Sequence, residues 1–301
     1  MPHYLMPDQE SLYVRQIGTG EPVLILSGLG MSSWQWLPFI LPSLKSRSFI
    51  IPDFRGFGGS KHCKIPSSLN AIDSHWQDIH ALLQQLNIGE IDVIGYSMGA
   101  TTTMHGLKYG QFSQYIKRYL HIDQSAKIKN DELWHFGLLG EQQQQLLQLM
   151  LKISGLVEPY QHYSSIANLP KDIQIQLLNL WLEFMQLQNP HSPLTALLGK
   201  LPLNKVQSHL MPLQSLQYIL WYLHTYLEHD EDYRDAIASL NKPTHFIIGK
   251  QSSLYGYHGQ LEIAQQLDDA TIHLMDKSGH VPLMSEPVKF GKILNEFLRA
   301  S

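Results

Sequence analysis

The chain has 301 residues, with 22 basic and 26 acidic side chains and a formal net charge of −4. Its apolar share of 44% is close to that of globular proteins, and its charged share of 16% is low and contains no long run of one sign. A basic nucleic-acid-binding surface and intrinsic disorder are therefore not expected.

Cysteine content and hydropathy bear on the compartment. The single cysteine, Cys63, excludes an intramolecular disulfide and a cysteine-rich zinc site. The first ten residues do not join a basic stretch to an apolar one, and no apolar run approaches the roughly 20 residues of a membrane span. We therefore expect a cytoplasmic protein without a membrane span.

Up to about residue 123, short apolar runs alternate with glycine-rich turns and helical patterns. The runs expected to form strands are residues 12–17, 23–26, 49–51, 91–94 and 119–122. Between them, residues 72–86 repeat apolar side chains at helical spacing. This alternation predicts a parallel sheet that helices cover on both faces.

From about residue 124 to 240 the strand patterns are absent. Helical spacing marks residues 133–153, 173–187 and 213–227. Strand patterns return at residues 244–248 and 271–275, before a closing helix at about 288–298. We therefore predict an α/β fold with a mostly parallel central sheet flanked by helices. Residues 1–123 and 241–301 would form its core, and residues 124–240 an all-helical cap.

The pentapeptide Gly95-Tyr96-Ser97-Met98-Gly99 fits the pattern G-x-S-x-G. It lies between the predicted strand 91–94 and a helical stretch at 100–107, which is the context of a nucleophile elbow. Such a sharp turn projects the serine hydroxyl, and glycines avoid collisions with the neighbouring elements. Ser97 is thus a candidate nucleophile, with the Met98 N–H at a helix start facing a developing oxyanion. The alternative is an ordinary glycine-flanked turn.

A serine hydroxyl needs a base to take its proton. Of the 16 histidines, His280 follows the last predicted strand and would lie at the same sheet edge as Ser97. The others fall mostly within helical or strand patterns, where structural roles are expected. No H-E-x-x-H motif occurs, and we expect neither a metal nor an organic cofactor.

Two further motifs precede the elbow. Ser27-Gly28-Leu29-Gly30 is followed by Trp34, and residues 53–60 read D-F-R-G-F-G-G-S. With the elbow and the terminal histidine, these motifs resemble those of the α/β-hydrolase superfamily, where His-Gly-x-Gly and D-x-R-G-x-G-x-S occur in this order. The resemblance implies an oxyanion hole made by the backbone N–H groups of Leu29 and Met98. It also implies that Asp53 and Arg55 brace loops.

A catalytic triad also needs an acid that orients His280, and the position of this acid departs from the commonest family pattern. Most relatives carry an aspartate shortly after the strand that here ends near Gly249, but this chain has none from residue 236 to 267. Asp123, directly after the strand 119–122, is the preferred candidate, and its I-D-Q-S segment resembles a non-haem chloroperoxidase-like subgroup. Glu262 and Asp276 remain alternatives, as does a helix-capping role for Asp123. Replacing Ser252 by alanine is expected to be nearly silent.

These features predict a serine hydrolase acting on a small-molecule ester or related acyl compound. Ser97 would attack, His280 would carry the proton and Asp123 would orient His280. Cofactor-free perhydrolysis of the haloperoxidase type, C–C bond hydrolysis and a non-catalytic small-molecule binder are the alternatives, since fold does not fix chemistry. The candidate substrate-binding residues are Trp34, Tyr96, Trp181 and Trp221. Substrate identity and oligomeric state stay open.

Overall fold

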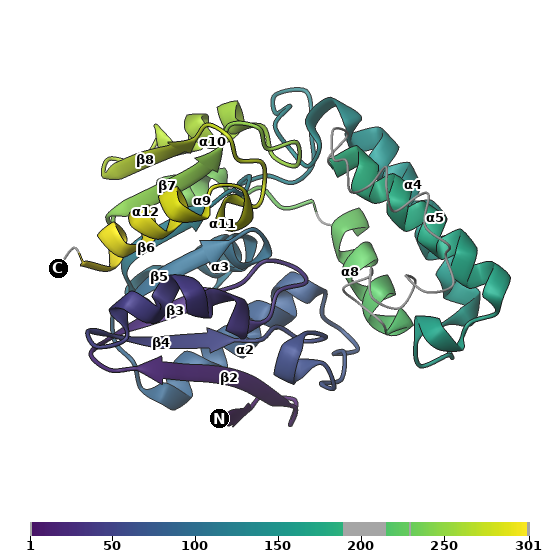
Figure 1. The fold of residues 1–301 in the computed structure, drawn as a ribbon, viewed down its shortest axis with the longest axis horizontal. Coiled ribbons are helices and arrows are strands. Elements are labelled where there is room, and N and C mark those ends of the chain that lie inside the picture. Colours follow the sequence, from purple (N-terminus) through teal and green to yellow (C-terminus); the bar gives the residue numbers. More distant parts are fainter. Residues whose placement is uncertain (1, 189–214, 229, 300–301) are drawn as a thin grey trace.

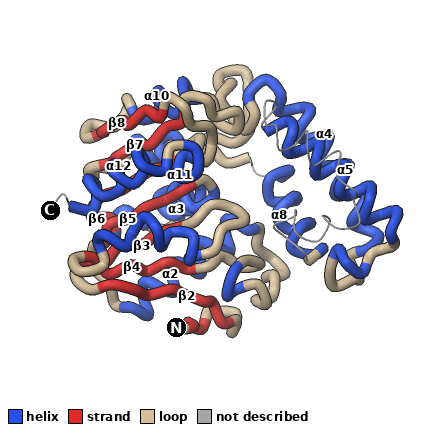
Figure 2. Tube along the Cα trace, in the orientation of Figure 1, coloured by secondary structure: helices blue, strands red, loops and turns tan. Residues whose placement is uncertain are grey.

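The computed structural model describes residues 2–188, 215–228 and 230–299, and a mixed sheet lies at its centre (Figures 1 and 2). The order across the sheet is β1-β2-β4-β3-β5-β6-β7-β8. β2 pairs antiparallel with β1 and β4, and all later neighbours are parallel. The strands are β1 (His3–Leu5), β2 (Ser11–Gly18), β3 (Glu21–Leu26), β4 (Arg47–Pro52), β5 (Ile91–Tyr96), β6 (Ile116–Ile122), β7 (Thr244–Gly249) and β8 (Ala270–Met275).

Every strand expected from the sequence is present, and the short edge strand β1 is an addition. β5 is buried along its whole length, as expected for a strand covered on both faces, and its one charged residue, Asp92, accepts from Arg118 Nε at 2.9 Å. It lies between β3 and β6, with Leu26 opposite Gly95 and Tyr96 opposite Ile122. Because these strands are parallel, the residues that follow β5, β6 and β7 meet at one edge of the sheet.

Helices cover both faces of the sheet and form a separate group beside it (Figure 2). The helices are α1 (Leu37–Ile40), α2 (Ala71–Leu86), α3 (Met98–Tyr109), α4 (Gln143–Val157), α5 (Lys171–Gln188), α8 (Leu216–Glu228), α9 (Arg234–Ala238), α10 (Tyr257–Ala264), α11 (Pro282–Ser285) and α12 (Pro287–Arg299). One apolar core joins the sheet to α2, α3, α9 and α10, and the other joins it to α1, α11 and α12. Within the described residues, no helix has both the length and the apolar character needed to cross a bilayer.

Between β6 and β7 the described elements are helical. α4, α5 and α8 lie to one side of the sheet in Figure 1 and share an apolar cluster of their own, in which Leu177 and Leu216 are fully buried. α5 and α8 occupy nearly the predicted ranges, although residues 213 and 214 lie outside the described part of the chain.

The expected start of the first of these helices, at residue 133, is wrong by ten residues. Asp131 Oδ1 accepts hydrogen bonds from the backbone N–H groups of Leu133 and Trp134, and Asn130 Oδ1 accepts one from Gly137. These side chains satisfy the backbone in turns rather than in a helix. The helix α4 therefore begins at Gln143.

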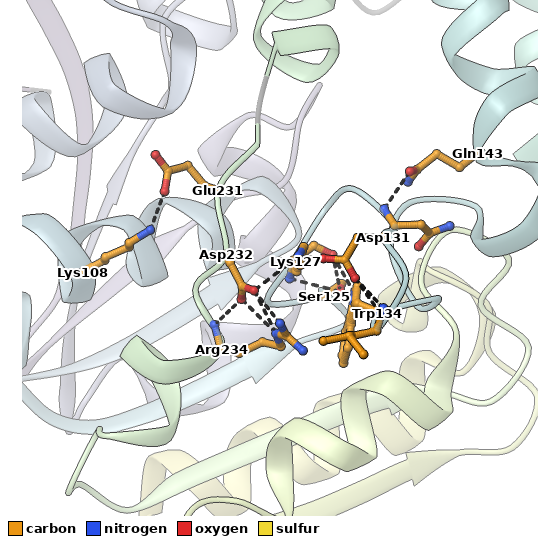
Figure 3. Close-up of polar contacts among 11 residues, drawn as sticks. Lys108, Ser125, Lys127, Asp131, Trp134, Gln143, Glu231, Asp232 and Arg234 are labelled. Carbon is orange, nitrogen blue, oxygen red and sulfur yellow. Dashed lines mark hydrogen bonds and ion pairs between the residues drawn. The ribbon is translucent and has the colours of Figure 1, made fainter.

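The chain leaves and re-enters the sheet layer at adjacent points (Figure 3). Lys127 and Asp232 form an isolated antiparallel bridge, and Lys127 Nζ lies 3.4 Å from Asp232 Oδ2. Arg234 donates to the same carboxylate, with Nη2 2.6 Å from Asp232 Oδ2, and its guanidinium lies 5.0 Å from the centre of the Trp134 ring. Lys108 on α3 pairs with Glu231 at 2.6 Å. Ion pairs and backbone hydrogen bonds thus hold together the chain segment that leaves the sheet layer and the one that re-enters it.

Candidate active site

Ser97 occupies a strained turn between β5 and α3. Its backbone angles are φ 52° and ψ −120°, outside the regions that L-residues usually adopt. The turn brings α3 so close to β3 that a Cβ atom on Gly99 would lie 2.0 Å from the carbonyl oxygen of Leu26. A glycine is therefore required two residues after the serine, as the elbow pattern predicts. The Ser97 side chain points out of this turn from a buried position.

His280 and Asp123 reach Ser97 in a chain of hydrogen bonds. His280 Nε2 lies 2.9 Å from Ser97 Oγ, and His280 Nδ1 lies 2.7 Å from Asp123 Oδ2. An ionised carboxylate only accepts hydrogen bonds, so Nδ1 carries the proton and Nε2 is free to accept from the serine hydroxyl. Tyr96 steadies the imidazole, since its hydroxyl donates to the His280 carbonyl at 2.9 Å and the two rings stack.

The alternative acids lie elsewhere. Asp276 is exposed and pairs with Lys250 at 2.9 Å, and Glu262 is exposed on α10. Asp123 does not cap an α-helix, because the next one, α4, begins twenty residues later. The carboxylate of Asp123 is fully buried and faces the imidazole.

The Asp123 carboxylate is held on both oxygens. Oδ1 accepts from the backbone N–H of Gly249 at 2.9 Å and from Gln260 Nε2 at 3.2 Å. Oδ2 accepts from His280 and from Ser252 Oγ, each at 2.7 Å. Gln260 was not expected here, because no motif in the sequence marks it. The expectation that Ser252 is dispensable conflicts with its direct contact to this carboxylate.

The backbone near Ser97 offers donors for an oxyanion. Met98 is the first residue of α3, so its N–H has no partner within the helix and lies at the positive end of the helix dipole. Gly28 packs against the elbow, and a Cβ on it would lie 3.3 Å from Ser97 Cβ. The following residue, Leu29, lines the cavity in front of Ser97.

The loop motifs upstream have structural contacts. Ser27 Oγ accepts from Trp36 Nε1 at 3.0 Å, so this serine supports a buried ring. Asp53 accepts from backbone N–H groups, including that of Gly59 at 2.8 Å. Arg55 pairs with the buried Asp78 at 2.6 Å. These contacts brace the loops beneath the elbow, as expected.

A cavity of about 370 Å³ opens in front of Ser97 and His280. Its walls come from the sheet-edge loops and from the helices between β6 and β7, and they are mostly apolar. The described residues between β6 and β7, here called the helical segment, contribute part of this wall. They are Leu138, Met150, Ile153, Trp181, Phe184, Gln188, Ile219, Tyr222, Leu223 and Tyr226. Polar groups in this cavity are few, which is typical of a small-molecule pocket that takes an apolar group.

Comparison with known proteins identifies the family. The sequence profile described as the alpha/beta hydrolase family matches residues 23–292. The chain belongs to the alpha/beta hydrolase family. Over 124 residues this hydrolase is 27% identical to a "Putative non-heme chloroperoxidase" from Synechocystis sp., a match covering 40% of this chain and 41% of that protein.

Solved structures resemble this hydrolase over nearly its whole length. An esterase from Exiguobacterium antarcticum matches with a TM-score of 0.70 at 16% identity, covering 99% of both chains. A bromoperoxidase from Bacillus anthracis matches with a TM-score of 0.66 at 17% identity, covering 97% of this chain and 96% of that one. At such identities the likeness establishes the fold, and membership of the family establishes a hydrolase enzyme.

Two of the four predicted substrate-binding residues line the hydrolase's cavity, namely Tyr96 and Trp181. Trp34 is 60% exposed and is not among the residues that line this cavity, so a role for it in substrate binding stays a prediction. Trp221 is not among the lining residues either, because its Nε1 donates to the Leu69 carbonyl at 2.8 Å and its ring packs against the core. The next residue on α8, Tyr222, lines the cavity instead. Helical spacing identifies an apolar face but not which neighbour that face contacts.

Proposed function

We propose that this hydrolase cleaves carboxylic esters with an apolar acyl group through an acyl-enzyme. The observation that carries the proposal is the hydrogen-bonded chain from Ser97 through His280 to Asp123, at the base of a mostly apolar cavity. We further propose that residues 124–240 act as a cap whose helices form the wall for the acyl group.

In the proposed reaction, Ser97 Oγ attacks the ester carbonyl carbon while its proton passes to His280 Nε2. The negative charge that develops on the carbonyl oxygen is stabilised by the backbone N–H groups of Leu29 and Met98. The bond to the alcohol oxygen then breaks, and the alcohol leaves with the proton from His280. Asp123 holds the imidazole in the required tautomer and stabilises its charged form.

Water completes the cycle. It attacks the acyl-enzyme carbonyl as His280 takes one of its protons, and the bond to Ser97 Oγ breaks. The carboxylic acid leaves and Ser97 regains its proton from His280. The chain's own residues carry each of these steps.

A second candidate reaction uses hydrogen peroxide in place of water in the last step and releases a peracid. The names of the Synechocystis and Bacillus anthracis relatives favour it. The acylation step is the same, so the two reactions differ only in which nucleophile resolves the acyl-enzyme.

Labelling with a fluorophosphonate and turnover of p-nitrophenyl esters test the proposal. We expect the label on Ser97, and a kcat/KM that rises from the acetate to longer acyl chains because the cavity buries apolar groups. Ser97→Ala is expected to lose both signals. Ser239→Ala is the matched control, because that exposed hydroxyl donates only to the nearby Ala236 carbonyl.

The outcomes that contradict the proposal are distinct. A wild-type protein that takes up no label lacks an activated serine. Labelling without cleavage of any ester in the series would refute the substrate class alone. Formation of the peracid of the ester's own acyl group in the presence of peroxide, at a rate above hydrolysis, would favour the second reaction.

A further inference from the structure

Ser252 touches the site from a part of the chain that the proposed mechanism does not use. It lies in the loop after β7, and its Oγ is 2.7 Å from Asp123 Oδ2, the oxygen that also accepts from His280 Nδ1. Ser252 is not among the residues that line the cavity in the described part of the chain. This hydroxyl can therefore affect catalysis through the Asp123 carboxylate without touching the substrate.

The geometry fixes the direction of the Ser252 hydroxyl. A hydroxyl has a single proton, and a carboxylate oxygen can only accept, so this proton points to Asp123. The backbone N–H of Tyr255 donates to Ser252 Oγ at 3.4 Å, and the Ser252 N–H donates to the Gly249 carbonyl at 3.1 Å. The loop thus aims the hydroxyl at the carboxylate.

Among the described side chains, Oδ2 of Asp123 has no donor other than Ser252 and His280. Gly249 and Gln260 hold the other oxygen. The two oxygens of an aspartate turn together about the soft Cβ–Cγ bond, so the hydrogen bonds to Oδ1 and the Ser252 hydroxyl on Oδ2 jointly fix the angle at which Oδ2 faces the imidazole. The hydroxyl also satisfies a lone pair of a buried charge, which is costly to leave unpaired.

We propose that Ser252 is a positioning residue for the hydrolysis. Its hydroxyl sets the orientation of the Asp123 carboxylate so that Oδ2 faces His280 Nδ1. This inference rests on the proposed function, because it presupposes that Asp123 orients the catalytic base. The serine lies in the loop after β7, so this loop supplies a hydrogen-bond donor to the acid that follows β6.

The test compares Ser252→Ala, Ser252→Thr and the control Ser239→Ala on a p-nitrophenyl ester. We expect Ser252→Ala to lower kcat by about 10- to 100-fold, the worth of one hydrogen bond to a charged group, with KM unchanged. Ser252→Thr retains a hydroxyl and is expected to recover most of the loss. If the alanine variant is poorly folded by circular dichroism, Ser252→Val against Ser252→Thr gives a pair of equal shape that differs in the hydroxyl.

A double-mutant cycle with Asp123→Asn separates positioning from a general structural role. If Ser252 acts through Asp123, Ser252→Ala has little further effect once Asp123 is replaced. An equal loss of kcat in both backgrounds would overturn the proposal. So would a hydroxyl-free variant that keeps the kcat of the Ser239→Ala control.

The rate of fluorophosphonate labelling separates failure of this inference from failure of the proposed function. Labelling depends on the activation of Ser97 and needs no ester. If Ser97 is labelled but no ester is cleaved, the substrate proposal fails and the same comparison of Ser252 variants is made on the labelling rate. If the wild-type protein is not labelled, both proposals fail.

Discussion

Two residues of the site have positive φ angles. Ser97 has φ 52° at the end of β5, and Asp123 has φ 40° at the end of β6. Such conformations are disfavoured for residues other than glycine and persist only where surrounding contacts hold them. At Asp123 those contacts include the backbone hydrogen bond from its own N–H to the Ile247 carbonyl, 2.9 Å long. Both side chains are thereby turned away from the sheet and toward His280.

Replacing Asp123 with asparagine is expected to lower kcat by about 10⁴-fold, as the same replacement of the orienting acid does in a serine-protease triad. The amide keeps the size of the side chain but cannot act as an anionic acceptor on both oxygens. The matched control is Asp276→Asn, since Asp276 was an alternative acid and pairs with Lys250 at the surface. Steady-state kinetics checks both. A greater loss from Asp276→Asn would contradict the role proposed for Asp123.

The sequence predicted the residues of the site that belong to a motif or follow a strand, namely Ser97, His280 and Asp123. It did not predict Ser252 and Gln260, because a hydrogen bond to a carboxylate more than a hundred residues away leaves no local pattern.

At the scale of elements, the strands could be predicted because buried parallel strands are continuous apolar runs. The boundaries between β6 and β7 were less accurate, because polar side chains such as Asp131 and Asn130 bond to the local backbone and delay the first helix. Apolar spacing continues through this stretch. The competing polar contacts become visible only in three dimensions.

The contacts of Asp232, where the chain re-enters the sheet layer beside Lys127, lead to a prediction about stability. Asp232→Ala removes an acceptor shared by Lys127 and Arg234 and is expected to lower the free energy of unfolding by about 1 kcal/mol, since these groups are only partly buried. Denaturant unfolding measures it. Glu296→Ala breaks an exposed pair with Lys292, 3.9 Å apart, and should have a smaller effect. Equal effects of the two variants would show that the Asp232 carboxylate does not hold the two chain segments together.

At the scale of the whole molecule, a buried histidine joins the helical segment to the sheet layer. His75 on α2 is fully buried, stacks on Phe54 and lies 3.0 Å from the hydroxyl of Tyr222 on α8. That hydroxyl donates to the Arg55 carbonyl at 2.8 Å, so it accepts from His75 Nε2. Burial, with a smaller contribution from the Arg55 charge, lowers the pKa of His75 to about 3.

This lowered pKa predicts a loss of stability in mild acid. Above pH 6.5 His75 is neutral in both the folded and the unfolded chain, whereas between pH 6.5 and about 3 only the unfolded chain takes up the proton. From pH 7 to pH 5 the free energy of unfolding should fall by about 2 kcal/mol from this residue. Urea unfolding of the wild type and of His75→Gln at both values checks it, and the variant should show the smaller fall. Parallel losses would contradict it, since the buried His121 contributes equally to both proteins.

The bridge between Lys127 and Asp232 also gives two adjacent positions at which the intervening stretch can be exchanged for that of another protein. Among the described residues, those that hydrogen-bond to Ser97 Oγ, to the His280 ring or to the Asp123 carboxylate all lie outside the stretch between Lys127 and Asp232. About half of the apolar residues that line the cavity lie inside it. Chimaeras that graft this stretch from another member of the family at the two bridged positions would therefore exchange substrate preference while inheriting the same nucleophile and its partners.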